Sequence, residues 1–447
     1  MRSILPLLAV NFVGALGLSL VMPFLVVLVE EFGGNGVVYG LMAAAYPTFQ
    51  LIGSPLLGRW SDRLGRRPVL LLSQAGTAAA WIVFYIALII PTVTLADIDS
   101  SRLGAFSVTV PLVVLFAARA LDGLTGGNVS VANALLADVS TADTRSRNFG
   151  LMGISSNMGF ILGPTLAGIL GATALGVRLP VIAAFCIAIV GLVLIGAFLP
   201  PPSPRRSATS SRGSADSSEK IVRQCPHAAT TSTDDMHANG LSTSAERGVR
   251  AVLRLPNVAL FLVLYFVLFL GFNVFYAVFP VHAFRVYGWT TAELGIFYST
   301  LSLVMLAVQG PVLRLLSTRV SEVGRVAGGS AVLALCFVML IFADGRWAFV
   351  AAVLFALGNG VMWPSFLAML SSLVSAEHQG EVQGYGTSAG SAASIVGLVA
   401  GGVLYEAIGT TAFAISGIAF LSVAILGVRL RQPPRERDTE SVSPSRA

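Results

Sequence analysis

The stretch GSPLLGRWSDRLGRRP, residues 53–68, lies between two long apolar runs and is unlike the rest of the chain. Four arginines and one aspartate fall within nine of its residues. A tight cytoplasmic turn between two membrane-spanning helices accounts for a segment that is so short and so basic. Gly58 and Gly65 allow a sharp turn, and Pro68 suits the first turn of the next helix. The stretch therefore predicts a membrane protein with several spans.

The composition supports the same class. The chain has 447 residues, of which 55% are hydrophobic and only 11% charged, and its mean hydropathy is +0.81. Ordinary globular chains carry about 25% charged residues, so most of this polypeptide is expected to lie in lipid. The net charge of +6 is dispersed through short loops, which argues against a nucleic-acid partner. Cys186, Cys225 and Cys336 show no paired spacing, so neither a disulfide framework nor a metal site is expected.

Twelve apolar runs are long enough to cross a bilayer, which takes about 20 residues. They are 4–29, 36–57, 68–91, 111–137, 149–172, 180–199, 257–281, 292–316, 325–343, 347–375, 382–404 and 410–430. We expect an all-α integral membrane fold with twelve transmembrane helices arranged as two six-helix repeats. The expected parts are an N-terminal bundle (1–199), a flexible cytoplasmic linker (200–255), a C-terminal bundle (256–431) and a disordered tail (432–447).

A weak internal repeat supports the two halves. Four residues recur at an offset of 256, namely Pro55, Leu57, Ser61 and Arg63 as Pro311, Leu313, Ser317 and Arg319. Three glycines recur at an offset of 234, namely Gly150, Gly163 and Gly168 as Gly384, Gly397 and Gly402. The difference of 22 residues is attributed to an extra loop around Ala96–Ser107 in the first half. Thr318 replaces Asp62 in the second copy, so the charged turn is complete only in the first.

The placement of basic residues predicts the orientation. If the N-terminus is cytoplasmic, nearly all Lys and Arg residues lie on the inner side. The exceptions are Arg102, Arg178, Arg285 and Arg346 in outer loops and Arg119 within a helix. We therefore expect a multi-pass protein of the inner (plasma) membrane with both termini in the cytoplasm.

The spacing G-x-x-S-D-R-x-G-R-R resembles the loop signature of the major facilitator superfamily of transporters. A cluster that only fixes orientation explains the arginines but explains neither the aspartate nor the glycine spacing. The resemblance implies a conformational latch that stabilises the outward-open state. The latch residues are Gly58, Asp62, Arg63, Gly65, Arg66 and Arg67.

The latch needs partners at the same membrane face. We expect Asp62 to accept hydrogen bonds from backbone amides at the start of the eleventh helix, near Val382–Gly386, where the helix dipole favours an anion. Arg63 or Arg66 is then expected to reach Asp138 at the inner end of the fourth helix.

The fourth predicted helix carries Arg119 and Asp122 one turn apart, close to mid-membrane. An ionisable group costs several kcal/mol there unless it is paired or hydrated, so both must face the bundle interior. One interpretation is an ion pair that locks the packing. The other is a proton or substrate route, and the arginine followed by glycines resembles the family motif whose arginine is assigned to proton coupling. Asp122, Arg119 and Asp138 are the proton-coupling candidates, with Glu381 as a further possibility if the pair is rigid.

The fifth predicted helix carries a row of small residues around a proline: Gly150, Gly159, Gly163, Pro164 and Gly168. The proline bends the helix, and the glycines leave a flat face for close helix contact. Taken alone this is a packing motif. Its full spacing also resembles the antiporter signature of facilitator-family drug/proton exchangers, a signature reported for exporters rather than for uptake symporters.

These motifs, together with the later run QGEVQG (379–384), resemble the tetracycline-resistance-like branch of the superfamily. One position differs from that branch. Its members carry an aspartate in the first helix, upstream of a Met-Pro pair. Here Met22-Pro23 is present, but Gly14 stands at the equivalent position and Asn11 is the polar residue nearby.

Several polar or aromatic residues on apolar runs are candidates to line a substrate cavity, and each is as readily explained by contacts between helices. They are Asn11, Gln50, Asn128, Asn157, Asn273, Tyr276, Gln309, Asn359 and Trp363.

We expect a secondary transporter that exports a small amphiphilic compound in exchange for protons. The alternatives are a proton-coupled uptake symporter and a receptor on the same fold. The chain has no HExxH, GxSxG or P-loop motif, so an enzyme is not expected. The proton gradient would supply the energy without a cofactor, the partners would be the bilayer, protons and a small molecule, and the expected unit is a monomer.

Overall fold

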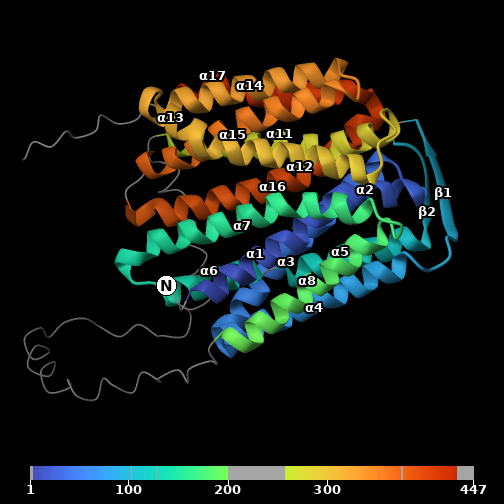
Figure 1. Cartoon of the computed structure of the whole chain (residues 1–447), viewed down its shortest axis with the longest axis horizontal. Coiled ribbons are helices and arrows are strands. Elements are labelled where there is room, and N and C mark those ends of the chain that lie inside the picture. The colour runs from blue at the N-terminus through green and yellow to red at the C-terminus, as the bar shows by residue number, and fades with distance from the viewer. Residues whose placement is uncertain (1–3, 102, 127, 200–256, 374–375, 430–447) are drawn as a thin grey trace, which may run out of the picture.

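Long helices that run side by side make up almost all of the structure, a computed structural model that describes residues 4–101, 103–126, 128–199, 257–373 and 376–429 (Figure 1). The predicted linker (200–255) and tail (432–447) lie outside these residues. The helices of the first half are α1 (Leu5–Leu20), α2 (Met22–Glu31), α3 (Gly36–Leu64), α4 (Arg66–Ala87), α5 (Val110–Thr125), α6 (Asn128–Asp138), α7 (Ala142–Gly171) and α8 (Arg178–Phe198).

The second half repeats this plan. Its elements are α11 (Val258–Arg285), α12 (Thr291–Ala307), the π-helical turn η2 (Val308–Val312), α13 (Leu313–Arg319), α14 (Glu322–Phe342), α15 (Trp347–Leu373), α16 (Ala376–Ile408), the 3-10 turn η3 (Gly409–Ala412) and α17 (Phe413–Gly427). Each of the twelve predicted spans is covered by one helix or by consecutive helical segments, so the predicted fold class is confirmed.

Three of the spans are divided where the sequence weakens a regular helix. The first divides at Val21, just before Pro23, which has no backbone N–H to donate to the preceding turn. The fourth divides after Gly126, where consecutive glycines lower helix propensity. The eighth passes through a π-helical turn that contains Pro311.

The charged stretch is not the long turn that its composition predicts. The helix α3 continues through Gly58 and Asp62 to Leu64, and the turn is confined to Gly65, whose φ of +97° favours glycine. The prediction for Gly65 is confirmed, and the prediction of a turn at Gly58 is wrong. Pro68 lies in the first turn of α4, as predicted.

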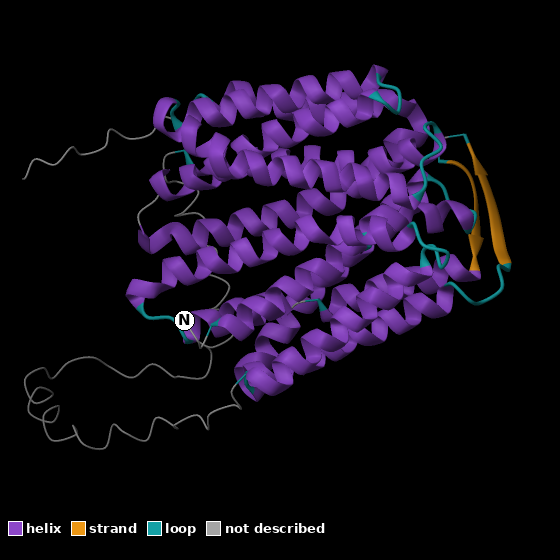
Figure 2. Cartoon of the chain, in the orientation of Figure 1, coloured by secondary structure: helices purple, strands orange, loops and turns teal. Residues whose placement is uncertain are grey.

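The extra segment of the first half is a β-hairpin rather than a loop. Strand β1 (Thr94–Ser100) pairs antiparallel with β2 (Gly104–Thr109), and Ile98 lies opposite Phe106. Figure 2 shows the hairpin at one end of the bundle, which we call the hairpin end. The opposite end, where Gly65 joins α3 to α4, is called the loop end.

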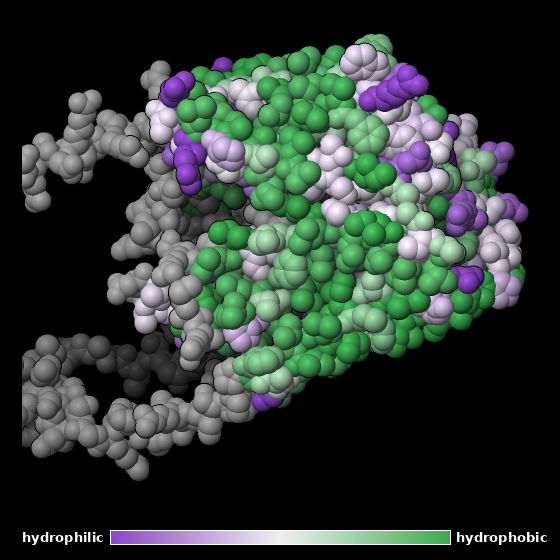
Figure 3. Space-filling model, viewed as in Figure 1, coloured by the Kyte–Doolittle hydropathy of each residue, from purple (hydrophilic) through white to green (hydrophobic). Residues whose placement is uncertain are grey.

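The surface fits a bilayer. On the face that Figure 3 shows, hydrophobic residues spread along the length of the bundle, with hydrophilic residues gathered toward its ends. Among the residues that the structure describes, nine helical stretches are long and apolar enough to span a membrane, and one of these, Gly384–Gly427, runs over two predicted spans. The other two predicted spans are α3, which carries the charged stretch, and the divided pair α5 and α6.

Candidate functional site

A buried ion pair lies in the first half. The Nη1 atom of Arg119 is 3.1 Å from Oδ2 of Asp122, one turn further along α5, and the two residues are only 2% and 7% exposed. The guanidinium of Arg119 also lies over the ring of Tyr46 in α3, 4.9 Å from its centre. The prediction that both charged residues face the bundle interior is confirmed.

Asp122 forms part of the wall of a cavity of about 190 Å³. The cavity lies within the first half, between α1 and the helices α3 to α8. Trp81 and Phe160 contribute aromatic surface. The polar lining consists of Asn11, Tyr46, Gln50, Gln74, Thr77, Asp122 and Ser156. A mostly apolar chamber with a few polar groups is the usual form of a small-molecule site.

Two of the predicted cavity residues are held firmly in this lining. Gln50 donates to the hydroxyl of Tyr46 (3.1 Å) and to the carbonyl of Gly126 (2.9 Å). Asn11 donates to the carbonyl of Met152 (3.0 Å) and to Oγ of Ser156 (2.6 Å). Both side chains are thus fixed on the cavity wall by the N–H groups of their amides.

Gln74 and Thr77 in α4 also lie on the cavity wall, and neither was among the residues predicted to do so. Gln74 donates to the carbonyl of Ala188 in α8 (3.0 Å), and the hydroxyl of Thr77 hydrogen-bonds Asp122. A usable signal was present, because Ser73, Gln74 and Thr77 form a polar stripe at helical spacing in an apolar span.

The cavity candidates of the second half do not line this chamber. Asn273 donates to Oγ of Ser394 (3.0 Å), Asn359 donates to Sδ of Met305 (3.4 Å), and Trp363 packs edge-on against Phe269. Tyr276 is stacked on Tyr298, and Gln309 lies in η2. The side chains of Asn128 and Asn157 lie outside the described part of the chain.

At the loop end, Arg66 forms ion pairs with two other residues of the first half. Its Nη1 is 2.6 Å from Oδ1 of Asp62 and its Nε is 3.1 Å from Oδ2 of Asp138. The predicted contact with Asp138 is therefore confirmed for Arg66, while Arg63 is exposed. Arg67 donates to the carbonyl of Gly196 in α8.

The expected amide partners of Asp62 are not available as predicted. The helix α16 begins at Ala376, so the backbone amides of Val382–Gly386 lie inside it rather than at its free N-terminus. The Asp62 side chain is 60% exposed and is paired with Arg66.

The glycine row of α7 makes two different contacts. Gly159 and Gly163 pack against α1 of the same half, where a Cβ on Gly159 would lie 2.7 Å from Cβ of Ala15. Gly168 instead faces α12 of the other half, where its Cβ would lie 2.6 Å from Cα of Gly295. Pro164 lies within α7, and Gly150 lies near the start of that helix.

The repeat has a structural counterpart at the hairpin end. Gly402, which the repeat pairs with Gly168, packs against Gly36 and Gly40 of α3. The halves thus meet at this end through two close crossings, α7 with α12 and α3 with α16. The hydroxyl of Tyr39 adds a hydrogen bond to the carbonyl of Tyr276 (3.2 Å).

Comparisons with known proteins agree with this architecture. The sequence pattern of the Major Facilitator Superfamily matches residues 7–358 and 326–446. The chain is 31% identical over 422 residues to the class G tetracycline resistance protein of Vibrio anguillarum, covering 92% of each chain. It is 30% identical over 402 residues to the class C protein of Escherichia coli, covering 89% and 88%.

Solved structures share the fold. A D-xylose-proton symporter matches with a TM-score of 0.69 at 14% identity, over 96% of this chain and 98% of that one. The human organic anion transporter MFSD10 matches with a TM-score of 0.61 at 22% identity, over 95% and 99%.

Proposed function

The chain belongs to the Major Facilitator Superfamily, and from this premise we propose that it exports a small amphiphilic compound in exchange for protons by alternating access. The observation that carries the proposal is the buried Arg119–Asp122 pair on a cavity wall, in a chain similar over 92% of its length to the class G tetracycline resistance protein. The fold neighbours do not favour uptake, because at 14% identity a symporter shares the fold alone.

In this proposal Asp122 carries the proton. A protonated Asp122 loses most of its attraction to Arg119, and the guanidinium keeps a second favourable contact on the ring of Tyr46. Deprotonation restores the pair. Because a lone charge is costly at this depth, the protonation state of Asp122 and the position of Arg119 are expected to change together.

The substrate contacts follow from the cavity lining. Asn11, Gln50 and Gln74 offer amide groups, and Trp81 and Phe160 offer aromatic surface. Gly14 also lines the cavity, and apart from its own helix backbone no atom of the described residues lies within 4 Å of the position where its Cβ would stand. The cavity therefore has free space beside Gly14 of the first helix. Its lining offers amide groups to a ligand and no carboxylate from that helix.

The topology that the arginines predict assigns the loop end to the cytoplasm, with both termini on that side of the inner membrane. Since the close crossings between the halves lie at the hairpin end, the structure then corresponds to a state closed to the outside. The latch is expected to stabilise the outward-open state, so its contacts with the second half should be broken in the state described here. The exposure of the Asp62 side chain fits this expectation. We take the working unit to be a monomer.

The test is a substrate panel on inverted membrane vesicles that hold a preset acidic interior. An exporter that exchanges substrate for protons will move an added substrate inward and protons outward, so the pH gradient collapses on addition. A symporter moves both in the same direction, so addition of its substrate deepens the gradient. Deepening, or no response to any compound that the cells demonstrably extrude through this protein, contradicts the proposal.

A further inference from the structure

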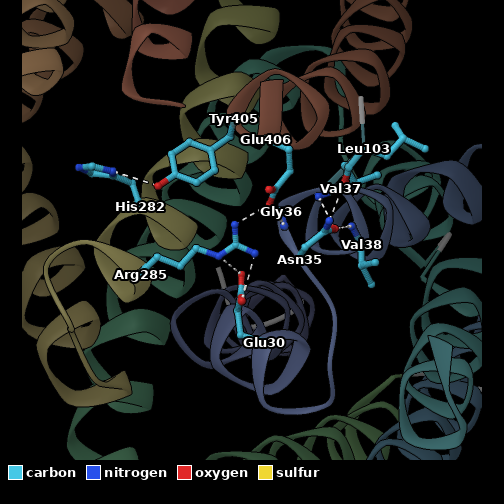
Figure 4. A network of polar contacts seen from close by, with 10 residues as sticks. All are labelled: Glu30, Asn35, Gly36, Val37, Val38, Leu103, His282, Arg285, Tyr405 and Glu406. Carbon is cyan, nitrogen blue, oxygen red and sulfur yellow. Dashed lines mark hydrogen bonds and ion pairs between the residues drawn. The ribbon is translucent and has the colours of Figure 1, made fainter. Parts of the chain in front are cut away.

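A cluster of charged residues joins the two halves at the hairpin end (Figure 4). Arg285 is the last residue of α11, Glu30 lies at the end of α2, and Glu406 lies in the last turn of α16. The guanidinium of Arg285 contacts both carboxylates. Its Nε is 2.8 Å from Oε1 of Glu30, its Nη2 is 3.2 Å from Oε2 of Glu30, and its Nη1 is 2.7 Å from Oε1 of Glu406.

The cluster also includes a backbone donor. The N–H of Gly36, the first residue of α3, donates to Oε1 of Glu406 over 2.6 Å. Two links therefore cross between the halves, Arg285 with Glu30 and Glu406 with Gly36. The third link, Arg285 with Glu406, lies within the second half. We call Glu30, Arg285, Glu406 and the N–H of Gly36 the hairpin-end clamp.

The charges suit their places on the helices. Glu406 faces the N-terminus of α3 and Arg285 ends α11, and the helix dipole favours both arrangements. Glu30 lies at a helix C-terminus, where a carboxylate is disfavoured, so it depends on Arg285. Both glutamate side chains are only 12% exposed, and charge-assisted contacts of this kind are strong when they are partly shielded from water.

The second half holds its part of the clamp in place. His282, one turn before Arg285, hydrogen-bonds the hydroxyl of Tyr405, the residue before Glu406 (3.1 Å, Figure 4). Arg285 therefore has a counter-charge within its own half, Glu406, besides Glu30 of the other half.

The β-hairpin covers the same place. Asn35 donates to the carbonyl of Leu103 (2.7 Å), and the backbone N–H of Ser107 donates to the carbonyl of Gly33 (2.8 Å). Gly104 lies so close to Glu406 that a Cβ there would be 3.1 Å from Oε2. The hairpin, which has no counterpart in the predicted repeat of the second half, thus covers the clamp.

We propose that the hairpin-end clamp is a gate, and that Arg285 is the residue that must release Glu30 before the transporter can open at this end. The inference rests on the proposed function insofar as alternating access requires the two crossings to part. Elsewhere in the described part of the chain, the ion pairs Arg66–Asp62, Arg66–Asp138 and Arg119–Asp122 each lie within the first half. Among these ion pairs, the clamp is therefore the one that forms between the two halves and must break when they separate.

The test measures the distance between the halves and needs no transport. Spin labels are placed on the full chain, in a background without native cysteines, at Leu175 in the α7–α8 turn and at Val286 just after α11, both exposed at the hairpin end. The wild type is expected to give mainly a short distance. In Arg285→Gln the fraction at longer distances is expected to rise about tenfold, because Glu30 and Glu406 are left without their shared cation. The control is Arg346→Gln, which makes the same charge change in the exposed α14–α15 turn at the same end.

Two further variants keep the test informative if Arg285→Gln does not fold. Glu30→Gln and Glu406→Gln keep the side-chain size and are expected to shift the distances in the same direction. The double variant Glu30→Gln/Arg285→Gln is expected to shift less than the two single shifts combined, since the pair acts as one unit. Distributions in the glutamate variants that match wild type and Arg346→Gln overturn the clamp, whatever vesicle flux shows about proton-coupled export.

Discussion

Replacing Gly168 by alanine adds one methyl group at the crossing of α7 with α12. The new Cβ would stand 2.6 Å from Cα of Gly295, whereas non-bonded carbon atoms are comfortable at about 3.5–4.0 Å. The two helices must therefore separate by about 1 Å at the hairpin end. Overpacking of this kind costs about 1–3 kcal/mol, and the cost falls only on the state in which these glycines touch.

The closed hairpin end should accordingly lose population relative to the open one by about 5- to 150-fold. The assay is the distance between labels at Leu175 and Val286, measured together with transport by the same variant. Gly153→Ala is the matched control, because Gly153 is exposed on the same helix and, within the part of the chain that the structure describes, nothing beyond its own helix backbone lies within 4 Å of its Cβ position. Gly159→Ala should instead lower stability without shifting the distance, since Gly159 packs within one half. A wild-type distribution and wild-type transport in Gly168→Ala refute the reasoning.

Two other changes test the loop end and the cavity. Asp62→Asn removes one partner of an exposed ion pair, so the free energy of unfolding should fall by less than about 1 kcal/mol. If the latch acts in the outward-open state, transport into vesicles should fall on the order of tenfold. Normal transport by this variant disproves the latch. Gly14→Leu places a side chain in open cavity space, so the free energy of unfolding should stay within about 0.5 kcal/mol of wild type while substrate binding is lost. Gly153→Leu is the control. Unchanged substrate binding in Gly14→Leu would show that the cavity is not on the substrate route.

The sequence predicted the parts of the site that stand out against apolar surroundings. Arg119 and Asp122 are charges within a spanning run, so their burial and pairing follow from the cost of an isolated charge in lipid. The turn at Gly65 was predictable because the chain must reverse its direction at the charged segment between two apolar runs. Gln74 is a weaker signal, because a single uncharged polar residue in a span is common and only the stripe that it forms with Ser73 and Thr77 marks it.

Other features depend on contacts that no local pattern contains. Glu30 and Arg285 are 255 residues apart and meet only because the two halves close at one end. The charge of the segment 58–64 is typical of a loop. Its backbone nevertheless continues α3 to Leu64, because the segment contains no proline and the turn itself is made by Gly65. The hairpin was expected as a loop because its strands are short and polar, and they are held by pairing with each other and with Gly33.

Proton coupling through Asp122 is tested most directly in liposomes that contain purified Asp122→Asn protein. Two rates are measured with the same substrate: proton flux driven by a substrate gradient, and exchange of labelled for unlabelled substrate, which needs no net proton movement. Asparagine keeps the size of the side chain but cannot carry a proton, so flux should be lost and exchange retained. Proton flux equal to that of the wild type contradicts the assignment of Asp122 as the carrier.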